Sequence, residues 1–149
     1  YYNDPDRTAE AFRNGWFHSG DLGRFDDEGY LYVVDRKKDM IKTGGENVAS
    51  REVEEAIFHH PDVAEVAVFG VPHPTWIEAV TAVVVAKSES SLTTDQLNSY
   101  CREHLAGFKS PKHFELVDAL PKNASGKILK RDLRQRFEKV FSDQKVEAG

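Results

Sequence analysis

The sequence predicts an α+β domain in which a small mixed or antiparallel sheet is flanked by helices. Strand-like and helix-like segments alternate along the 149 residues, and several connectors are too short for the crossovers of a parallel sheet. The run at 79–86 is almost continuously aliphatic and β-branched, which is typical of a central strand buried on both faces. The apolar fraction of 40% is that of a globular protein.

The N-terminal part of the chain predicts a short helix followed by a hairpin. Residues 7–12 are expected to be helical, with Asp4 as the N-cap and Pro5 at the first helical position. A hairpin is expected over 25–35, because the acidic segment at 26–29 ends in glycine and precedes a run of aromatic and β-branched residues. These residues are expected to belong to a different body from the rest.

Apolar periodicity and capping signals predict the remaining elements. Glu52 and Glu54 fall in the first turn of a helix that begins at Ser50, where the helix dipole favours acidic side chains. Thr93 and Gln96 have the spacing of a capping box ahead of an apolar stripe. The other expected features are strands at 40–43, 63–71, 79–86 and 114–117, a rigid turn at 71–76, helices ending near residue 105 and spanning 130–141, and a frayed tail at 142–149.

The charge balance limits the classes of partner. A formal net charge of −5 argues against general nucleic-acid binding, because proteins that neutralise many phosphates carry a basic surplus. The segment at 122–136 is locally basic, which fits either the solvated face of an amphipathic helix or a surface that faces an anion. No apolar run approaches the roughly 18 residues of a membrane span, so no transmembrane segment is expected.

Cysteine and histidine usage argues against a disulfide and a metal site. Cys101 is the only cysteine, which favours a reducing, cytoplasmic compartment, and its helical spacing with Leu97 and Leu105 favours a core position over a nucleophile. The six histidines lack partners at ligand spacing, so no metal site is expected. The chain begins at Tyr1 within a pattern typical of ordered structure, which suggests a piece of a longer protein.

Three turn-like segments supply the carboxylate, guanidinium and ammonium groups that a nucleotide requires. Asp21 could accept two hydrogen bonds from ribose hydroxyls, or it could stabilise its own turn. Arg36 could contact phosphates, or it could pair with its neighbour Asp35. Lys127 could face an anion, or it could be a solvated loop residue. The three segments are 15–21, 35–39 and 121–127.

Two glycine-containing segments allow other interpretations. The segment around Lys127 is no P-loop, because Pro121 and Ile128 stand where that motif needs a glycine and a hydroxyl residue. Gly44 and Gly45 either end a strand or let a ligand approach the backbone closely. Taken singly, these signals are weak, and it is their order along the chain that is informative.

The segments at 15–21, 35–48 and 120–128 resemble the last three conserved blocks of the adenylate-forming superfamily, which contains acyl-CoA synthetases, peptide-synthetase adenylation domains and luciferases. The resemblance covers residues 1 to about 138. It implies an enzyme in which a carboxylate attacks the α-phosphate of ATP to give an acyl-adenylate and pyrophosphate. The acyl group then passes to a thiol, commonly that of CoA.

The resemblance also implies roles for residues of the first half-reaction. Asp21 matches the acid that holds the ribose hydroxyls, and Arg36 matches the arginine near the ribose and phosphates. Lys127 matches the catalytic lysine that bridges the acyl carboxylate and the nucleotide. Lys38 falls at the family's hinge, where many relatives have aspartate and some have lysine.

Further residues match the family's second half-reaction. Gly44, Gly45 and Glu46 match the loop that lines the channel for the pantetheine arm of CoA. Lys42 corresponds to a lysine that luciferase-like members use in this step. The family's ATP, Mg²⁺ and acid sites lie mainly in a much larger N-terminal domain, so this chain alone is expected to be inactive.

The implied domains are the end of that large domain at 1–35, a mobile C-terminal domain at 36–141 and the frayed tail at 142–149. The preferred hypothesis is the C-terminal part of a fatty or aryl acid–CoA ligase, whose partners are its own N-terminal domain, a carboxylic acid, ATP and CoA. The alternatives are a peptide-synthetase or luciferase-like lobe, and a non-catalytic interaction module that retains the fold.

Overall fold

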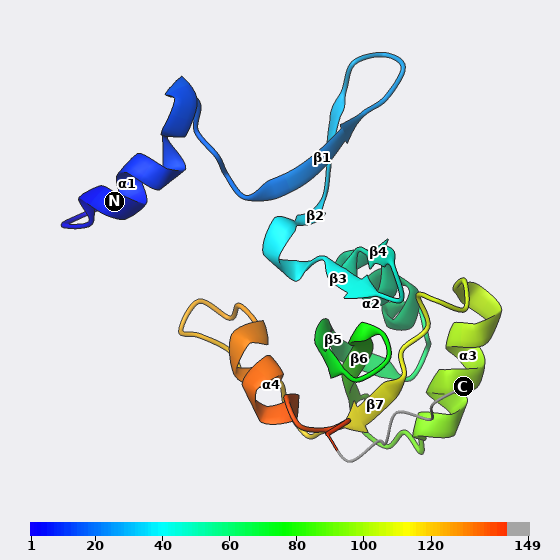
Figure 1. The fold of residues 1–149 in the computed structure, drawn as a ribbon. Helices are drawn as coiled ribbons and strands as arrows, with labels where there is room; N and C mark the ends of the chain where they lie inside the picture. The colour runs from blue at the N-terminus through cyan, green and yellow to red at the C-terminus, as the bar shows by residue number, and fades with distance from the viewer. Residues whose placement is uncertain (143–149) are drawn as a thin grey trace. The chain divides into compact units, whose positions relative to one another are not determined.

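A computed structural model describes residues 1–142, and its chain separates into two compact units. The first unit is Tyr1–Lys38 and the second begins at Asp39 (Figure 1). Both combine helices with a sheet, so the α+β class is confirmed. Of the predicted tail, only Ser142 lies within the described residues.

The first unit begins with the predicted helix, α1 (Pro5–Ala11), followed by the short 3-10 turn η1 (Arg13–Gly15). The side chain of Asp4 caps α1 by accepting a hydrogen bond from the backbone N–H of Arg7 at 3.0 Å. Proline at the first helical position fits because its missing N–H has no partner there. The N-cap prediction is therefore confirmed.

The predicted hairpin follows as β1 (Asp21–Phe25) and β2 (Leu31–Arg36), which form a two-stranded antiparallel sheet. Asp26 orders the turn, because its Oδ1 accepts hydrogen bonds from the backbone N–H groups of Tyr30 at 2.8 Å and Glu28 at 3.0 Å. The N–H of Tyr30 is the main cause of a lowered pKa at Asp26. A 3-10 turn, η2 (Lys37–Asp39), follows the hairpin.

The second unit is built on a five-stranded mixed sheet with β6 in its interior. β6 pairs antiparallel with β5 on one side, and on the other with β3 at one end and parallel with β7 farther along. β4 extends the sheet beyond β3. The elements are β3 (Ile41–Thr43), β4 (Glu46–Val48), α2 (Ser50–Phe58), β5 (Val63–His73), β6 (Ile77–Ala86), α3 (Thr94–His104), β7 (His113–Leu116) and α4 (Lys130–Phe137).

Helices cover both faces of this sheet, so this unit has three layers (Figure 1). One apolar cluster lies on each face of the sheet. Val66 and Val68 of β5 point to the face covered by α2 and α3, while Phe69 points to the face covered by α4. This alternation is the two-residue period of a strand. Residues 79–84 of β6 are all buried, which confirms the predicted central strand.

Some predicted boundaries were wrong, and one short strand was missed. The turn between the long strands is tighter than 71–76, because His73 still pairs with Ile77. The last helix ends at Phe137 rather than 141, although Phe141 is still buried against the rings of His73 and His113. The short strand β4 was not predicted. The capping box at Thr93 is confirmed by reciprocal hydrogen bonds with Gln96.

Candidate functional site

Lys127 lies near the tip of a hairpin-like loop at 121–129, drawn in orange before α4 in Figure 1. The base of the loop is closed by an antiparallel bridge between Lys122 and Ile128 and by a hydrogen bond from Leu129 N to Pro121 O of 2.8 Å. The turn-like segment predicted around Lys127 is therefore a defined hairpin, with Lys127 next to the bridge.

Asn123 orders the tip of this loop. Its Oδ1 accepts hydrogen bonds from the backbone N–H of Lys127 at 2.9 Å and from the N–H and hydroxyl of Ser125 at 3.1 and 2.8 Å. Gly126 has a φ of +80°, a conformation that glycine adopts without steric cost. These interactions fix the backbone of Lys127 although the loop is exposed.

The lysines of this segment have different partners. Lys122 Nζ lies 2.6 Å from Glu65 Oε2, and Lys130 Nζ lies 2.7 Å from Glu54 Oε1. Lys127 is exposed, and among residues 1–142 no ion pair involves its ammonium. The basic residues at 122–136 are therefore not equivalent. Lys122 and Lys130 are paired with glutamates, whereas the ammonium of Lys127 is available for a ligand.

The two residues predicted to bind a nucleotide lie together on the hairpin of the first unit. Asp21 on β1 is the register partner of Arg36 on β2, and Arg36 Nε lies 3.7 Å from Asp21 Oδ1. Asp35, the alternative partner considered for Arg36, is buried, and its carboxylate accepts a hydrogen bond from the backbone N–H of Arg36 at 2.7 Å. Asp21 and Arg36 are themselves exposed.

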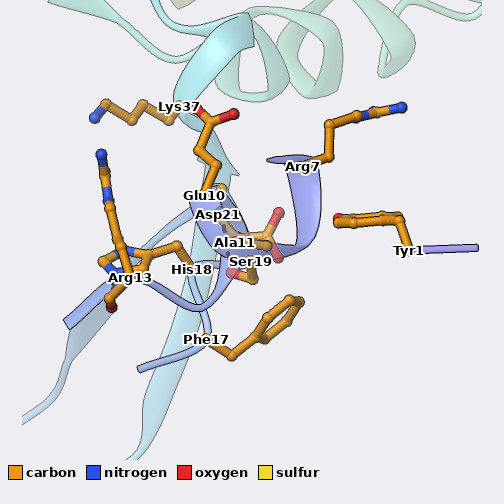
Figure 2. A pocket seen from close by; sticks show the side chains of 11 residues that line it. Tyr1, Arg7, Glu10, Ala11, Arg13, Phe17, His18, Ser19, Asp21 and Lys37 are labelled. Atoms are coloured by element: carbon orange, nitrogen blue, oxygen red, sulfur yellow. Dashed lines mark hydrogen bonds between the residues drawn. The ribbon is translucent and has the colours of Figure 1, made fainter. Parts of the chain in front are cut away.

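A cavity of about 540 Å³ in the first unit includes Asp21 in its lining (Figure 2). Asp21 N donates a hydrogen bond to Ser19 Oγ at 3.1 Å, so local turn stabilisation and a ligand-facing position occur together. The cations Arg7, Arg13 and Lys37 also line this cavity, and sequence reasoning did not single them out. Glu10 adds a second carboxylate, so the lining carries charges of both signs, which suits a ligand with both hydroxyl and anionic groups.

The glycine turn joins β3 to β4, and both of its glycines have positive φ, +58° at Gly44 and +88° at Gly45. A Cβ at Gly45 would meet nothing within 4 Å, so this backbone is open to a ligand. The turn also ends β3, so both functions considered for the glycines are compatible with the structure. Glu46 begins β4, and Lys42 is exposed on β3.

Neighbouring segments hold the glycine turn. Glu78 Oε2 accepts a hydrogen bond from Lys42 N at 2.7 Å, and Trp76 O accepts one from Gly44 N at 3.0 Å. Gly70 leaves room for Glu78, because a Cβ there would lie 2.9 Å from the carboxylate carbon. Ile77, between Trp76 and Glu78, has a φ of +70°, which is strained for a β-branched residue.

A cavity of about 250 Å³ lies beside this turn, lined in part by Gly44 and Glu46. Its other walls include Trp76, Phe108 and Lys112, and Lys112 Nζ lies 5.2 Å from the centroid of the Trp76 ring. Both groups are engaged within the fold, because the Trp76 ring stacks on that of His73 with centroids 4.2 Å apart and Lys112 Nζ donates a hydrogen bond to Gly107 O at 3.3 Å. Trp76 also packs against the apolar cluster on the α4 face of the sheet, which fits its place in the predicted rigid turn.

Lys38 lies between residues that are held by different units. Lys37 N donates a hydrogen bond to Gly20 O at 2.8 Å within the first unit. Asp39 Oδ1 lies 2.8 Å from Arg134 Nη2 of α4 within the second unit, and the side chain of Asp39 is 13% exposed. A change of backbone angles at Lys38 would therefore break neither contact.

Residues 52–127 match the AMP-binding enzyme C-terminal domain family. The chain belongs to this family. It is 50% identical over 137 residues to a feruloyl-CoA synthase from an Amycolatopsis species, covering 92% of this chain and 28% of that protein. It is 48% identical over 137 residues to a long-chain-fatty-acid–CoA ligase of Mycobacterium tuberculosis, covering 92% of this chain and 27% of that protein.

Solved structures also resemble this member of the AMP-binding enzyme C-terminal domain family. ATP-bound MatB from Rhodopseudomonas palustris matches with a TM-score of 0.87 at 40% identity, over 95% of this chain and 28% of that chain. The o-succinylbenzoate CoA synthetase MenE from Bacillus subtilis, in complex with its acyl-adenylate intermediate, matches with a TM-score of 0.83 at 41% identity, over 90% and 27%. The chain thus spans little more than a quarter of the length of these relatives.

Proposed function

We propose that this chain is the C-terminal part of an AMP-forming acid–CoA ligase, which activates a carboxylic acid with ATP and transfers the acyl group to CoA. The observation that carries the proposal is the Lys127 loop. It presents an exposed ammonium on a hydrogen-bonded backbone, while Lys122 and Lys130 on either side are paired with glutamates. The relatives named as feruloyl-CoA, fatty-acid and succinylbenzoate ligases favour an aryl or fatty acid as substrate.

In the first half-reaction, Lys127 binds the acyl carboxylate and the nucleotide together. Negative charge gathers around the α-phosphorus as the carboxylate attacks, and the ammonium stabilises that charge. In a site with little water this is worth several kcal/mol, or about 10²- to 10³-fold in rate. Lysine suits the position because its compact charge sits on a long side chain.

Asp21 and Arg36 would contact the nucleotide. Their opposite charges lie 3.7 Å apart on adjacent strands, so one group can accept from ribose hydroxyls while the other faces phosphate oxygens. By the family resemblance, Mg²⁺ and most of the ATP site would be held by a larger N-terminal domain.

The glycine turn and the cavity beside it would serve the second half-reaction. Bare backbone at Gly44 and Gly45 would let the pantetheine arm of CoA pass closely. Lys112, which lines this cavity, would face the phosphates of the CoA nucleotide. Lys42, exposed on β3 next to this turn, is a further candidate for the same step.

The two half-reactions would be connected by rotation at Lys38. The ties of Lys37 to Gly20 and of Asp39 to Arg134 support this, because each unit keeps its own contacts up to the residue next to Lys38. Hinges need only a few residues that absorb a change of φ and ψ. We place the boundary between the end of the large domain and the mobile domain at residues 36–38, since Arg36 and Lys37 keep contacts within the first unit. The chain alone is expected to be inactive, and the full-length protein is expected in the cytoplasm.

One observation favours an amine, in place of a thiol, as the acceptor of the acyl group. The chain matches the amide bond synthetase McbA from Marinactinospora thermotolerans with a TM-score of 0.81 at 39% identity, over 92% of this chain and 28% of that one. An amine could therefore replace the thiol in the second half-reaction. Product formation with CoA, with a carrier-protein thiol and with an amine, each from the same acyl-adenylate, would separate these possibilities.

The proposal is tested by assaying the two half-reactions separately in the full-length protein that contains this chain. Lys127→Ala is expected to lower acid-dependent pyrophosphate release about 10²- to 10³-fold and to spare thioester formation from supplied acyl-adenylate. Lys38→Pro is expected to show the opposite preference, because a fixed φ blocks the rotation. Near-normal pyrophosphate release in Lys127→Ala would refute the assignment, and equal losses in Lys38→Pro would refute the hinge.

A further inference from the structure

The Lys127 loop is attached to the body of its unit by a lysine–glutamate pair at each end. Lys122 pairs with Glu65 of β5, and Lys130 pairs with Glu54 of α2. The two glutamates come from consecutive elements of the helix-and-sheet body, far from the loop in sequence. Both ends of the loop are therefore held by the part of the fold that is most fully buried.

Glu54 makes the more extensive of the two attachments. Its Oε1 accepts a hydrogen bond from Val68 N of β5 at 2.8 Å and lies 2.7 Å from Lys130 Nζ. Lys130 Nζ also donates a hydrogen bond to Ser50 Oγ at 2.9 Å. The side chains of Glu54 and Lys130 are 22% and 19% exposed, so the pair is shielded from solvent. Glu54 thus connects α2, β5 and the start of α4.

Stability alone is a poor explanation for this pair. Removing two charges from water is costly, and a partly buried pair of this kind contributes little net stability. In addition, Lys130 is the first residue of α4, where the positive end of the helix dipole opposes a cation. The carboxylate of Glu54 offsets that repulsion and sets the direction in which the chain leaves the loop.

The tip of the loop is ordered from within, so its position depends on its ends. Asn123 fixes the backbone of Ser125 and Lys127, and the bridge between Lys122 and Ile128 closes the base. Because these internal contacts do not involve the anchors, loss of an anchor is expected to shift the loop as one piece. Because an error of about 1 Å in the position of a catalytic group can cost about 100-fold in rate, the anchors bear directly on the chemistry.

We propose that Glu54 is a positioning residue for Lys127, acting through its ion pair with Lys130. This inference rests on the proposed function, since it requires Lys127 to act in acyl-adenylate formation. Glu65 acts in the same way through Lys122, but more weakly, because the side chains of this pair are 35% and 38% exposed. Neither glutamate touches the reacting atoms.

The test is Glu54→Gln in the full-length protein, with both half-reactions measured. Pyrophosphate release at saturating ATP and acid is expected to fall about 10- to 100-fold. Thioester formation from supplied acyl-adenylate is expected to stay within about twofold of the parent, because the glycine turn does not depend on Glu54. Glu65→Gln is expected to lower pyrophosphate release by less than Glu54→Gln.

Glu55→Gln is the matched control. Glu55 lies on the same helix and pairs with Arg51 at 3.0 Å, and both side chains are exposed, unlike those of Glu54 and Lys130. Both half-reactions are expected to be unchanged in this variant. Lys130→Met is expected to reproduce the effect of Glu54→Gln, and the double variant is expected to lose no more than the more impaired single variant, because one interaction is removed in each case.

The outcomes separate this inference from the proposed function. If Lys127→Ala abolishes pyrophosphate release but Glu54→Gln does not lower it, the positioning role is wrong and the proposed function stands. If Glu54→Gln lowers both half-reactions equally along with the melting temperature, its role is structural and the inference is overturned. If Lys127→Ala leaves pyrophosphate release intact, the proposed function itself fails.

Discussion

The two units of this protein differ in how they bury their apolar side chains. The second unit has apolar clusters on both faces of its sheet, and Phe69, Ile57 and Leu97 are completely buried. In the first unit, Ala11 and Asp35 are the buried residues. Its exposed large apolar side chains are Tyr1, Tyr2, Phe12, Trp16, Phe17, Phe25, Tyr30, Leu31, Tyr32 and Val33.

This difference shows that a segment can form regular secondary structure without forming a hydrophobic core. The hairpin and the capped helix of the first unit satisfy their own hydrogen bonds, yet they bury little apolar surface. A segment of this size rarely folds alone without covering that surface. Asp21 and Arg36, the candidate nucleotide-binding residues, therefore lie on the unit that buries little apolar surface. Lys127 lies on the unit that has its own hydrophobic core.

The largest expected effect concerns independent folding. A fragment of residues 39–149 is expected to show native-like circular dichroism and a cooperative thermal transition. A fragment of residues 1–38 is expected to show neither, because its apolar side chains lack a core. A cooperative transition in the shorter fragment would contradict the comparison between the units.

A matched pair of phenylalanines tests the same comparison by mutation. Phe69→Ala in the second unit is expected to lower the free energy of unfolding by about 3–5 kcal/mol, because Phe69 is completely buried. Phe25→Ala in the first unit is expected to change it by less than about 0.5 kcal/mol, because Phe25 is 70% exposed. Both values come from urea unfolding of the whole chain. Equal losses would mean that Phe25 is buried in solution.

The smallest expected effect depends on pH. Cys101 is completely buried between α3 and the sheet, and this burial raises the pKa of its thiol to about 11. Because the pKa is higher in the folded state, this stabilisation is present in full below the pKa of the unfolded thiol, about 8.5, and is lost as pH rises toward 11. The free energy of unfolding should fall over that window, by roughly 1–3 kcal/mol.

The contribution of the thiol is isolated by comparing the parent with Cys101→Ala across the same pH range. Lysine and tyrosine side chains titrate there as well, so the difference between the two slopes is the relevant quantity. The variant is expected to lose less stability between pH 8.5 and 11. Identical slopes in both proteins would show that the thiol titrates alike in the folded and unfolded states.

The elements that could be predicted from sequence are those whose signals are local. The cap at Asp4, the capping box at Thr93 and the hairpin around Asp26 each involve residues within four positions of one another. The strand at 79–86 was predictable because burial on both faces requires an apolar residue at every position. The end of α4 was predicted wrongly, because Phe141 packs against the rings of His73 and His113, which are distant in sequence. The strand β4 was missed although its partner β3 lies only a glycine turn away.

By itself, the amino-acid sequence determined the local hydrogen bonding, the positions of the glycine turns and the family, because these depend on residue type and short spacing. Tertiary structure alone decided which basic side chains are paired. Lys130 meets Ser50 across 80 positions, and Lys122 meets Glu65 from a distant loop, which leaves the ammonium of Lys127 exposed. Such pairing is set by how the helix, the sheet and the loop pack together, and no local pattern encodes it.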